Sequence, residues 1–400
     1  MKILHINTKD TGGAANACMR IHKSLLDKGI GSKVLVLRKT KNIPEVYQYS
    51  YWDFPKSRID TLKRTIKLAI YERHLRNQRA RMTVPVEILS YPTTIYDITE
   101  HPFYKEADII QLNWVSGFLD EPSFFKKNTK PVIWRMADLY ICGGGNHYEK
   151  EFPFNAYQDI LNKNYIIRKA SLEGKKINLV AISNWTKQKA LDCELLKGQP
   201  ITIIQNGIDT NIFKQYNKKL VREALGLPLE KKIILFGADV LSVPRKGMHL
   251  LFESINSLTE NKNVLFCAFG NTYIPLKENI LPLGPIGDEI LLAMIYSAAD
   301  LFIMPSIEET FGQVILESLA CGTPIVSFPT GGALDTIKDN FNGFLAKDFT
   351  SKGLTAAIEK ALSFSFNRDE IRNDIIRNFN VVDKADLFID LYTSILNHKS

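Results

Sequence analysis

The sequence predicts an α/β protein of two domains, each built on a doubly wound parallel sheet. Short apolar segments of strand length alternate with segments of helical periodicity in both halves of the chain, which is typical of βαβ units. The 400 residues also suffice for two domains that each bury a hydrophobic core. The segments expected to form strands are 2–6, 33–37, 108–112, 131–135, 178–182, 232–236, 263–269, 300–304 and 324–328.

The boundary between the domains is expected at the segment from Asn206 to Asp209, because its Gly and Asp residues favour a turn. The first domain then comprises residues 1–204 and the second comprises residues 205–378. The sequence contains no internal repeat and no low-complexity segment that would suggest another architecture.

The composition favours a soluble cytosolic protein. Hydrophobic residues make up 45% and charged residues 24% of the chain, as in ordinary globular proteins. No apolar run approaches the roughly 20 residues of a membrane span, and the first residues lack the apolar core of a signal peptide. The 5 cysteines are scattered without a C-x-x-C pair, which argues against a disulfide framework and against a zinc site.

The two halves of the chain differ in charge. Residues 1–200 contain 32 Lys and Arg against 20 Asp and Glu, a net charge of +12, whereas residues 201–400 contain 19 against 23, a net charge of −4. This asymmetry suggests that the first domain meets a polyanionic partner.

The most informative residues for function are two acids eight positions apart, Glu309 and Glu317. Glu309 is expected in the loop after the strand 300–304, and Glu317 about two turns into a helix over 312–321. In open α/β sheets, ligands bind outside the carboxyl ends of the strands. Carboxylates there can accept hydrogen bonds from vicinal hydroxyls, one from a ribose and the other from a hexose. The alternative is an acidic first turn that complements the helix dipole.

Two further segments have the chemistry of phosphate binding. Arg245 and Lys246 can neutralise a diphosphate without a metal, and no Asp-x-Asp metal motif occurs in the chain. The alternative is two solvated loop cations. Gly12 and Gly13 follow the first strand and let backbone N–H groups approach a diphosphate at a helix N-terminus. The segment is not G-x-G-x-x-G, which disfavours a nicotinamide enzyme, and a plain tight turn remains open.

The pair Glu309 and Glu317 resembles the E-x7-E signature of the family 4 retaining glycosyltransferases. That resemblance implies the GT-B fold, in which two Rossmann-like domains face a central cleft and a C-terminal segment, here about 379–400 with a helix over about 381–397, completes the first domain. The segment from Trp134 to Tyr148 is most similar to the exopolysaccharide and colanic-acid branch. Other matching segments are 4–15, 180–185, 204–210, 234–238, 244–247 and 330–335.

The resemblance implies roles for residues of the second domain. Glu309 would contact the transferred hexose, with Arg245 and Lys246 as catalytic cations and Glu317 on the ribose. The family usually has an arginine where this chain has Ala238, and Arg245 is the candidate to replace it. Further donor contacts are expected from Gly12, Gly13, Ile286, Asp288, Thr310, Phe311 and Gly312. Asp288 could accept from a guanine base or could be a helix N-cap.

The same resemblance places the acceptor side on the first domain. Its candidate residues are Asn113, Asp138 and His147. Many relatives have histidine directly before the aspartate, where this chain has Ala137, and histidine where it has Asn113. His147 could supply the polar contact instead, or it could be a solvated loop histidine.

Residues 56–81 predict a basic amphipathic helix. The segment contains nine Lys and Arg against Asp60 and Glu72, and four aliphatic residues recur at helical spacing. Such a helix can lie on an anionic membrane leaflet. The alternative is a helix packed on its own domain with a solvated basic face. Nucleic acid is not expected, because no recognition motif accompanies the charge.

Together these features predict a cytosolic, metal-independent, retaining hexosyltransferase without a cofactor. Its donor would be a nucleotide-diphosphate sugar, and its acceptor a lipid-linked oligosaccharide at the inner membrane face, in the assembly of exopolysaccharide or another surface polysaccharide. The protein would associate peripherally with the anionic membrane. The alternatives are a non-catalytic nucleotide-sugar-binding protein and an epimerase or phosphorylase of the same fold.

Overall fold

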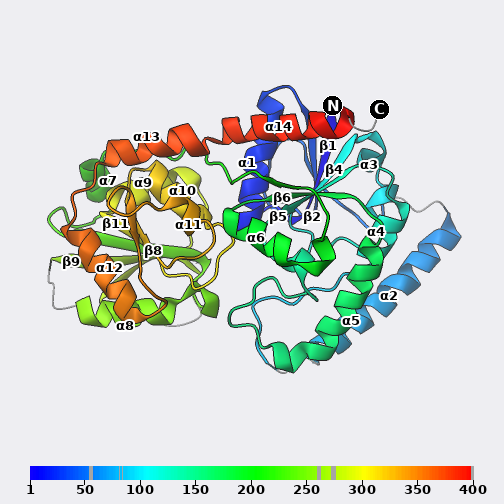
Figure 1. Cartoon of the computed structure of the whole chain (residues 1–400), viewed down its shortest axis with the longest axis horizontal. Coiled ribbons are helices and arrows are strands. Elements are labelled where there is room, and N and C mark those ends of the chain that lie inside the picture. Colours follow the sequence, from blue (N-terminus) through cyan, green and yellow to red (C-terminus); the bar gives the residue numbers. More distant parts are fainter. Residues whose placement is uncertain (54–56, 81, 83, 259–262, 272–275, 398–400) are drawn as a thin grey trace. The chain divides into compact units, whose positions relative to one another are not determined.

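A computed structural model describes residues 1–53, 57–80, 82, 84–258, 263–271 and 276–397. The chain forms two compact units. The first consists of residues 1–182, 186–204 and 387–400, and the second of residues 183–185 and 205–386. Figure 1 shows the strands of each unit at its centre with helices outside them, so the predicted α/β architecture of two parallel-sheet domains is confirmed.

The first unit contains a seven-stranded sheet in the order β3-β2-β1-β4-β5-β6-β7, and every paired strand is parallel to its neighbour. The strands are β1 (Lys2–Lys9), β2 (Gly31–Arg38), β3 (Val46–Gln48), β4 (Ile109–Leu112), β5 (Val132–Met136), β6 (Ile177–Ala181) and β7 (Ile201–Ile203). The helices over this part of the chain are α1 (Gly13–Asp27), α2 (Arg58–Ala80), α3 (Pro102–Glu106), α4 (Glu121–Lys127), α5 (Phe154–Leu172) and α6 (Asn184–Asp192).

The second unit contains a six-stranded parallel sheet in the order β10-β9-β8-β11-β12-β13. The strands are β8 (Lys232–Val240), β9 (Val264–Asn271), β10 (Ile280–Gly284), β11 (Leu301–Met304), β12 (Ile325–Ser327) and β13 (Gly343–Leu345). The helices are α7 (Lys218–Ala224), α8 (Met248–Leu258), α9 (Glu289–Ala298), α10 (Gln313–Ala320), α11 (Ala333–Thr336), α12 (Ser351–Ser363) and α13 (Arg368–Phe379).

The strand orders locate the edge at which a ligand site forms. In the first unit the chain runs outward from β1 to β2 and β3 and returns to the other side of β1 with β4. In the second unit it runs from β8 to β9 and β10 and returns beside β8 with β11. The loops after β8 and β11 therefore leave neighbouring strands in opposite directions, which creates the crevice where open α/β sheets bind ligands.

The last helix, α14 (Val381–Asn397), has the bounds expected from the sequence. From Leu387 onward the chain belongs to the first unit, so it returns there a little later than the expected residue 379. The Tyr392 hydroxyl donates a hydrogen bond to Gln111 Oε1 at 2.5 Å, and both residues are buried. This bond ties the helix to β4.

Within the described ranges, none of the helices combines the length and the apolar character that crossing a membrane requires.

Candidate functional site

Three of the predicted site residues gather at the carboxyl edge of the second unit's sheet. Arg245 and Lys246 lie in a 3₁₀ turn, Pro244–Lys246, which follows β8, and Glu309 lies in the loop that follows β11. Lys246 Nζ is 2.5 Å and Arg245 Nη1 3.3 Å from the same carboxylate oxygen, Oε2 of Glu309. The sequence left solvated loop cations as an alternative, but Arg245 is only 6% exposed.

The two cations decide the ionisation of Glu309. Burial of its carboxyl raises the pKa, but the charges of Lys246 and Arg245 and their hydrogen bonds more than offset this and lower the pKa to about 2. Glu309 is therefore a carboxylate at every physiological pH. It can accept hydrogen bonds but cannot donate a proton.

Glycines bring a third loop against this cluster. Gly331 has a φ of +51°, and a Cβ there would lie 1.8 Å from the Glu309 carbonyl oxygen. The preceding Thr330 accepts a hydrogen bond from the Glu309 N–H at 3.1 Å through its hydroxyl oxygen. Gly247 has a φ of +66°, and its Cβ would lie 1.9 Å from the Pro305 carbonyl oxygen. The backbone around Glu309 is thus fixed from both neighbouring loops.

The second acid, Glu317, lies in a different environment. It is carried by α10, which begins after Gly312 in the left-handed conformation, and it is 5% exposed. The Tyr296 hydroxyl of α9 donates to Glu317 Oε2 at 3.3 Å. The two acids were expected to bind hydroxyl groups of different sugars. Glu309 has cationic partners, whereas Glu317 accepts from the neutral hydroxyl of Tyr296.

The residues between the two acids support the loop. Phe311 is 1% exposed, and the Thr310 carbonyl oxygen accepts a hydrogen bond from the Ser183 hydroxyl at 2.8 Å. A Cβ on Gly332 would lie 2.5 Å from the Phe311 carbonyl oxygen. Any donor contact from Thr310 or Gly312 would therefore come from a backbone that the fold holds in place.

The two residues expected at the nucleobase lie just before α9. The Asp288 carboxylate is the N-cap of this helix and accepts from the Leu291 N–H at 2.7 Å. Of the two alternatives that the sequence left for Asp288, the structure shows the cap, and Ile286 nearby is half-buried. The other predicted donor loop, in the first unit, has Gly12 with a φ of +91° as the N-cap of α1.

Two of the predicted acceptor-side residues of the first unit, Asp138 and His147, belong to one buried hydrogen-bond network. Asp138 Oδ2 accepts from Trp114 Nε1 at 2.8 Å and lies 2.5 Å from His147 Nδ1, while Oδ1 accepts from the Tyr140 N–H at 3.0 Å. His147 Nε2 is 2.8 Å from the Ser90 hydroxyl, which in turn contacts the Ser116 hydroxyl.

This network corrects one expectation about His147. The sequence allowed a solvated loop histidine, but the side chain is 1% exposed and both ring nitrogens have protein partners. Asn113 is equally buried and accepts from Gln111 Nε2 at 3.2 Å. Ser90 and Ser116 were missed, because isolated serines far apart in the chain carry no pattern that links them to Asp138.

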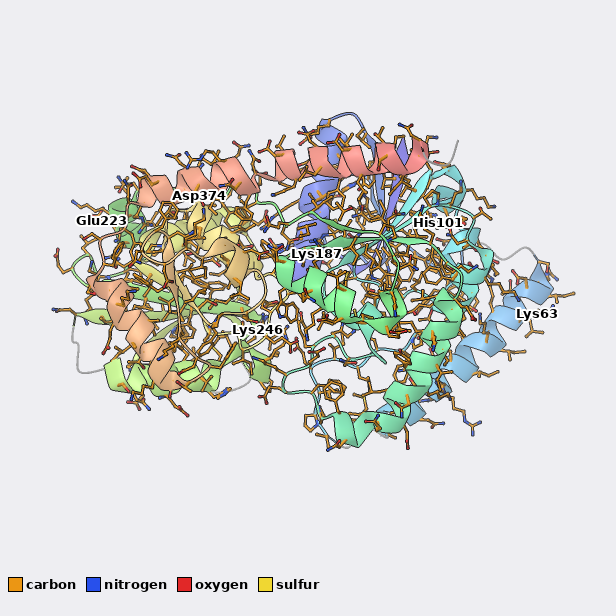
Figure 2. The ribbon with its side chains drawn as sticks, in the orientation of Figure 1. Lys63, His101, Lys187, Glu223, Lys246 and Asp374 are labelled. Carbon is orange, nitrogen blue, oxygen red and sulfur yellow. The ribbon has the colours of Figure 1, made fainter. Side chains whose placement is uncertain are left out.

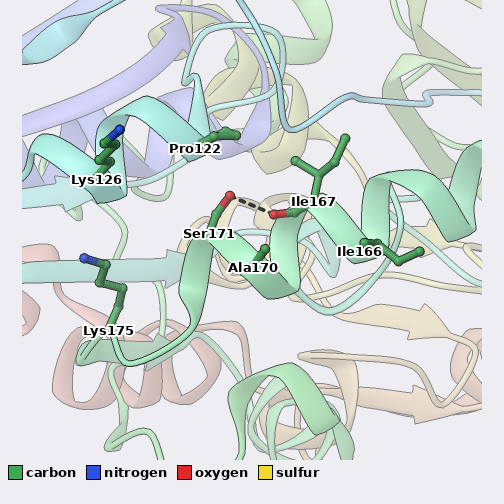
Figure 3. Close-up of a pocket in the computed structure, with 7 residues that line it drawn as sticks. All are labelled: Pro122, Lys126, Ile166, Ile167, Ala170, Ser171 and Lys175. Carbon is green, nitrogen blue, oxygen red and sulfur yellow. Dashed lines mark hydrogen bonds between the residues drawn. The ribbon is translucent and has the colours of Figure 1, made fainter.

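The first unit also has a surface hollow of about 550 Å³ between α4 and α5 (Figure 3). Its lining consists of Pro122, Lys126, Ile166, Ile167, Ala170, Ser171 and Lys175. The predicted site residues are not among them. Over the described part of the chain, no three His, Cys, Asp or Glu side chains are grouped as metal ligands would be.

Comparisons with known proteins found relatives of the second unit and of the whole chain. Residues 217–379, all within the second unit, match the family model of the Glycosyl transferases group 1. A D-inositol 3-phosphate glycosyltransferase of Thermobispora bispora is 26% identical over 378 residues, which cover 89% of this chain and 82% of that protein. A glycogen synthase of Thermodesulfovibrio yellowstonii is 28% identical over 57% of this chain, and the chain spans about half of that relative (48%).

Solved structures share the whole fold. Sucrose-phosphate synthase from Thermosynechococcus elongatus superposes with a TM-score of 0.72 at 16% identity and covers 100% of both chains. Anabaena HepE in complex with UDP and glucose gives a TM-score of 0.70 at 18% identity, over 98% of this chain and 100% of that one. The chain therefore has the GT-B fold, and its second unit is similar to the Glycosyl transferases group 1.

Proposed function

We propose that this protein is a retaining hexosyltransferase that moves a hexose from a nucleotide-diphosphate sugar to a hydroxyl of a glycan acceptor. The observation that carries the proposal is the cluster of Glu309, Arg245 and Lys246 at the crevice edge of the second unit. An ionised acid that can accept sugar hydroxyls there lies beside two cations that can bind phosphate.

The cations would act on the leaving group. As the bond between the anomeric carbon and the diphosphate breaks, negative charge develops on the phosphate oxygens. An ammonium has three N–H donors and a guanidinium five, so Lys246 and Arg245 can bind phosphate while they remain paired with Glu309. Because these fixed charges stabilise the departing diphosphate, we propose that the reaction needs no metal ion.

The two acids would hold the two sugars of the donor. Glu309 accepts from hydroxyls of the hexose, and its lowered pKa keeps it an acceptor throughout the reaction. Glu317 accepts from the ribose hydroxyls, in the manner in which it already accepts from Tyr296. Donor recognition by both acids would then be independent of the nucleobase, which we expect near Ile286.

Retention requires the acceptor hydroxyl to attack the face that the diphosphate leaves. In this proposal a phosphate oxygen of the donor takes the proton of the attacking hydroxyl, so the protein need not supply a general base. That assignment fits the chemistry of Glu309, whose carboxylate is paired with two cations and is a poor proton acceptor at a pKa of about 2.

We further propose that the acceptor is a lipid-linked oligosaccharide used in surface polysaccharide assembly, at the cytoplasmic face of the membrane. The support comes from the first half of the chain, whose segment from Trp134 to Tyr148 resembles the exopolysaccharide branch and whose net charge is +12. A carrier lipid with a phosphate or diphosphate headgroup is anionic, as is the membrane surface around it.

The test is a screen of nucleotide sugars by thermal shift, followed by an assay for released nucleotide with the sugar that binds. We expect one donor to stabilise the protein and to be turned over slowly by hydrolysis and faster with acceptor. The anomeric configuration of the product, read by NMR, should equal that of the donor. Stabilisation without any release of nucleotide would instead support the alternative, a non-catalytic nucleotide-sugar-binding protein.

A further inference from the structure

Helix α2 carries two apolar stripes on opposite sides. Leu68 and Tyr71 are partly buried and pack against the hydrophobic core of the first unit. A second stripe, which we call the outer stripe, consists of Ile59, Leu62, Ile66 and Ile70, and these side chains are 68%, 60%, 53% and 64% exposed. At 3.6 residues per turn the outer stripe lies opposite Leu68. The aliphatic spacing seen in the sequence is therefore not the core-facing side of this helix.

Polar contacts hold the helix in this orientation. Arg64, on the inner side, donates to Glu100 at 2.6 Å, to Asp60 at 3.2 Å and to the Tyr51 carbonyl oxygen at 2.8 Å. Its guanidinium also lies 5.3 Å from the ring centroid of Tyr51. Because the inner side is fixed by packing and by these bonds, the outer stripe stays exposed.

Cations flank the outer stripe on both sides. Lys63 and Lys67 follow one flank of the helix, and Arg58 and Arg76 the other, while Arg73 continues the line of the stripe beyond Ile70. All five cationic residues are exposed. Figure 2 labels Lys63 on α2. Of the two acids of the helix, Asp60 is paired with Arg64, and Glu72 lies nearer to the side of Leu68 than to the outer stripe. Lys56 and Arg81, the ends of the predicted basic segment, lie outside the described residues.

We propose that the outer stripe is the surface by which the protein inserts into an anionic lipid leaflet, with the flanking cations at the level of the headgroups. An apolar stripe between two rows of cations matches a leaflet that is apolar below a negative surface. From Ile59 to Ile70 the stripe is about 16 Å long at 1.5 Å per residue, enough for shallow insertion along the surface. The geometry of this surface does not depend on the proposed function. Only its use, which is to reach a lipid-linked acceptor, rests on that proposal.

Charge also argues against a second copy of the chain as the molecule that covers the outer stripe. Two outer stripes packed together would bring Lys63, Lys67, Arg73 and Arg76 of both copies close to one another, and like charges at an interface oppose association. A leaflet that contains anionic lipid instead gains from each cation it meets.

The test is co-sedimentation with vesicles of phosphatidylglycerol and phosphatidylcholine against vesicles of phosphatidylcholine alone, at low and high salt. We expect the protein to bind the anionic vesicles and to be released by salt. Ile66→Ser should weaken partitioning about tenfold, because a buried aliphatic side chain is lost. Reversing Lys63 and Lys67 to Glu should weaken it on the order of a hundredfold.

Leu191→Ser is the matched control, since Leu191 is 57% exposed in the same unit but lies on α6. It should partition as the wild type does, and all variants should keep the wild-type melting temperature and donor hydrolysis. Failure of the wild type to bind anionic vesicles would overturn this inference and leave the proposed function standing. A dimer that Ile66→Ser dissociates would overturn it in favour of self-association.

Discussion

Two buried acids, Glu309 in the second unit and Asp138 in the first, each follow the carboxyl end of an interior strand of their sheet, β11 and β5. Glu309 has two cationic partners, Arg245 and Lys246, and the side chain of Lys246 is 21% exposed. Asp138 has neutral donors, Trp114 and the Tyr140 N–H, and the ring of His147. Both acids lie at the carboxyl edge of a parallel sheet, but only Glu309 is paired with lysine and arginine.

From this difference we infer different roles for the two acids. Cations that hold a carboxylate can also hold a phosphate, so the Glu309 cluster has chemistry to offer an anionic ligand. The hydrogen bonds of Asp138 are used within the protein, where they join three segments of the first unit. We therefore expect changes at the Glu309 cluster to affect turnover, and changes at Asp138 to affect stability.

The largest effect is expected for Lys246→Ala. It removes the cation nearest to Glu309 and, in the proposed reaction, a partner of the leaving diphosphate. Turnover should fall on the order of 10²-fold or more, while wild-type activity should persist in excess chelator. Loss of wild-type turnover in chelator with recovery in Mg²⁺ or Mn²⁺ would reject the metal-free reaction.

Asp138→Asn should act on the fold instead. The substitution keeps the shape of the side chain but replaces one carboxylate oxygen with an NH₂ group. That group would face the N–H donor of Trp114 or Tyr140. Chemical denaturation should show a loss of about 2–3 kcal/mol in the free energy of unfolding, as expected for buried hydrogen bonds to a charged group. Hydrolysis of the donor at saturating concentration should change little. A large loss of turnover in a fully stable variant would show that Asp138 acts in the reaction.

The acid dependence of stability should reveal the ion pairs of Glu309. Its pKa of about 2 in the folded protein lies below the ordinary value of about 4.3. The contribution to stability is therefore complete above about pH 4.3 and is lost as the pH falls toward 2. Between pH 6 and pH 3 the wild type should lose about 2 kcal/mol that Glu309→Gln does not lose. Parallel curves for the two proteins would mean that the ion pairs do not form in solution.

The sequence predicted the central strands and missed the outer ones. The four strands that were not expected, β3, β7, β10 and β13, are the two edges of each sheet. β3, β7 and β13 are only 3 residues long, and β3, β7 and β10 contain exposed or half-buried residues. None of the four therefore has the continuous apolar run of a strand that is covered on both faces. The central strand β11, by contrast, is buried at every position.

In the site, too, contacts that follow from neighbouring strands could be predicted, and contacts between distant loops could not. Glu309 and Lys246 could be predicted to meet, because parallel neighbouring strands deliver both loops to one edge. The burial of His147 could not, because its partners Ser90 and Asp138 come from separate loops. Likewise the spacing of Ile59 and Ile66 shows a helical stripe but not which side of α2 meets the core.

The central claim is that the two acids of the second unit bind different parts of one donor, and a paired measurement on Glu309→Gln and Glu317→Gln tests it most directly. Calorimetry should show free nucleoside diphosphate binding about tenfold more weakly to Glu317→Gln, since a ribose contact is lost, and nearly unchanged to Glu309→Gln. Turnover should fall on the order of 10²-fold in Glu309→Gln. Equal and small effects of both substitutions on binding and on turnover would contradict the account.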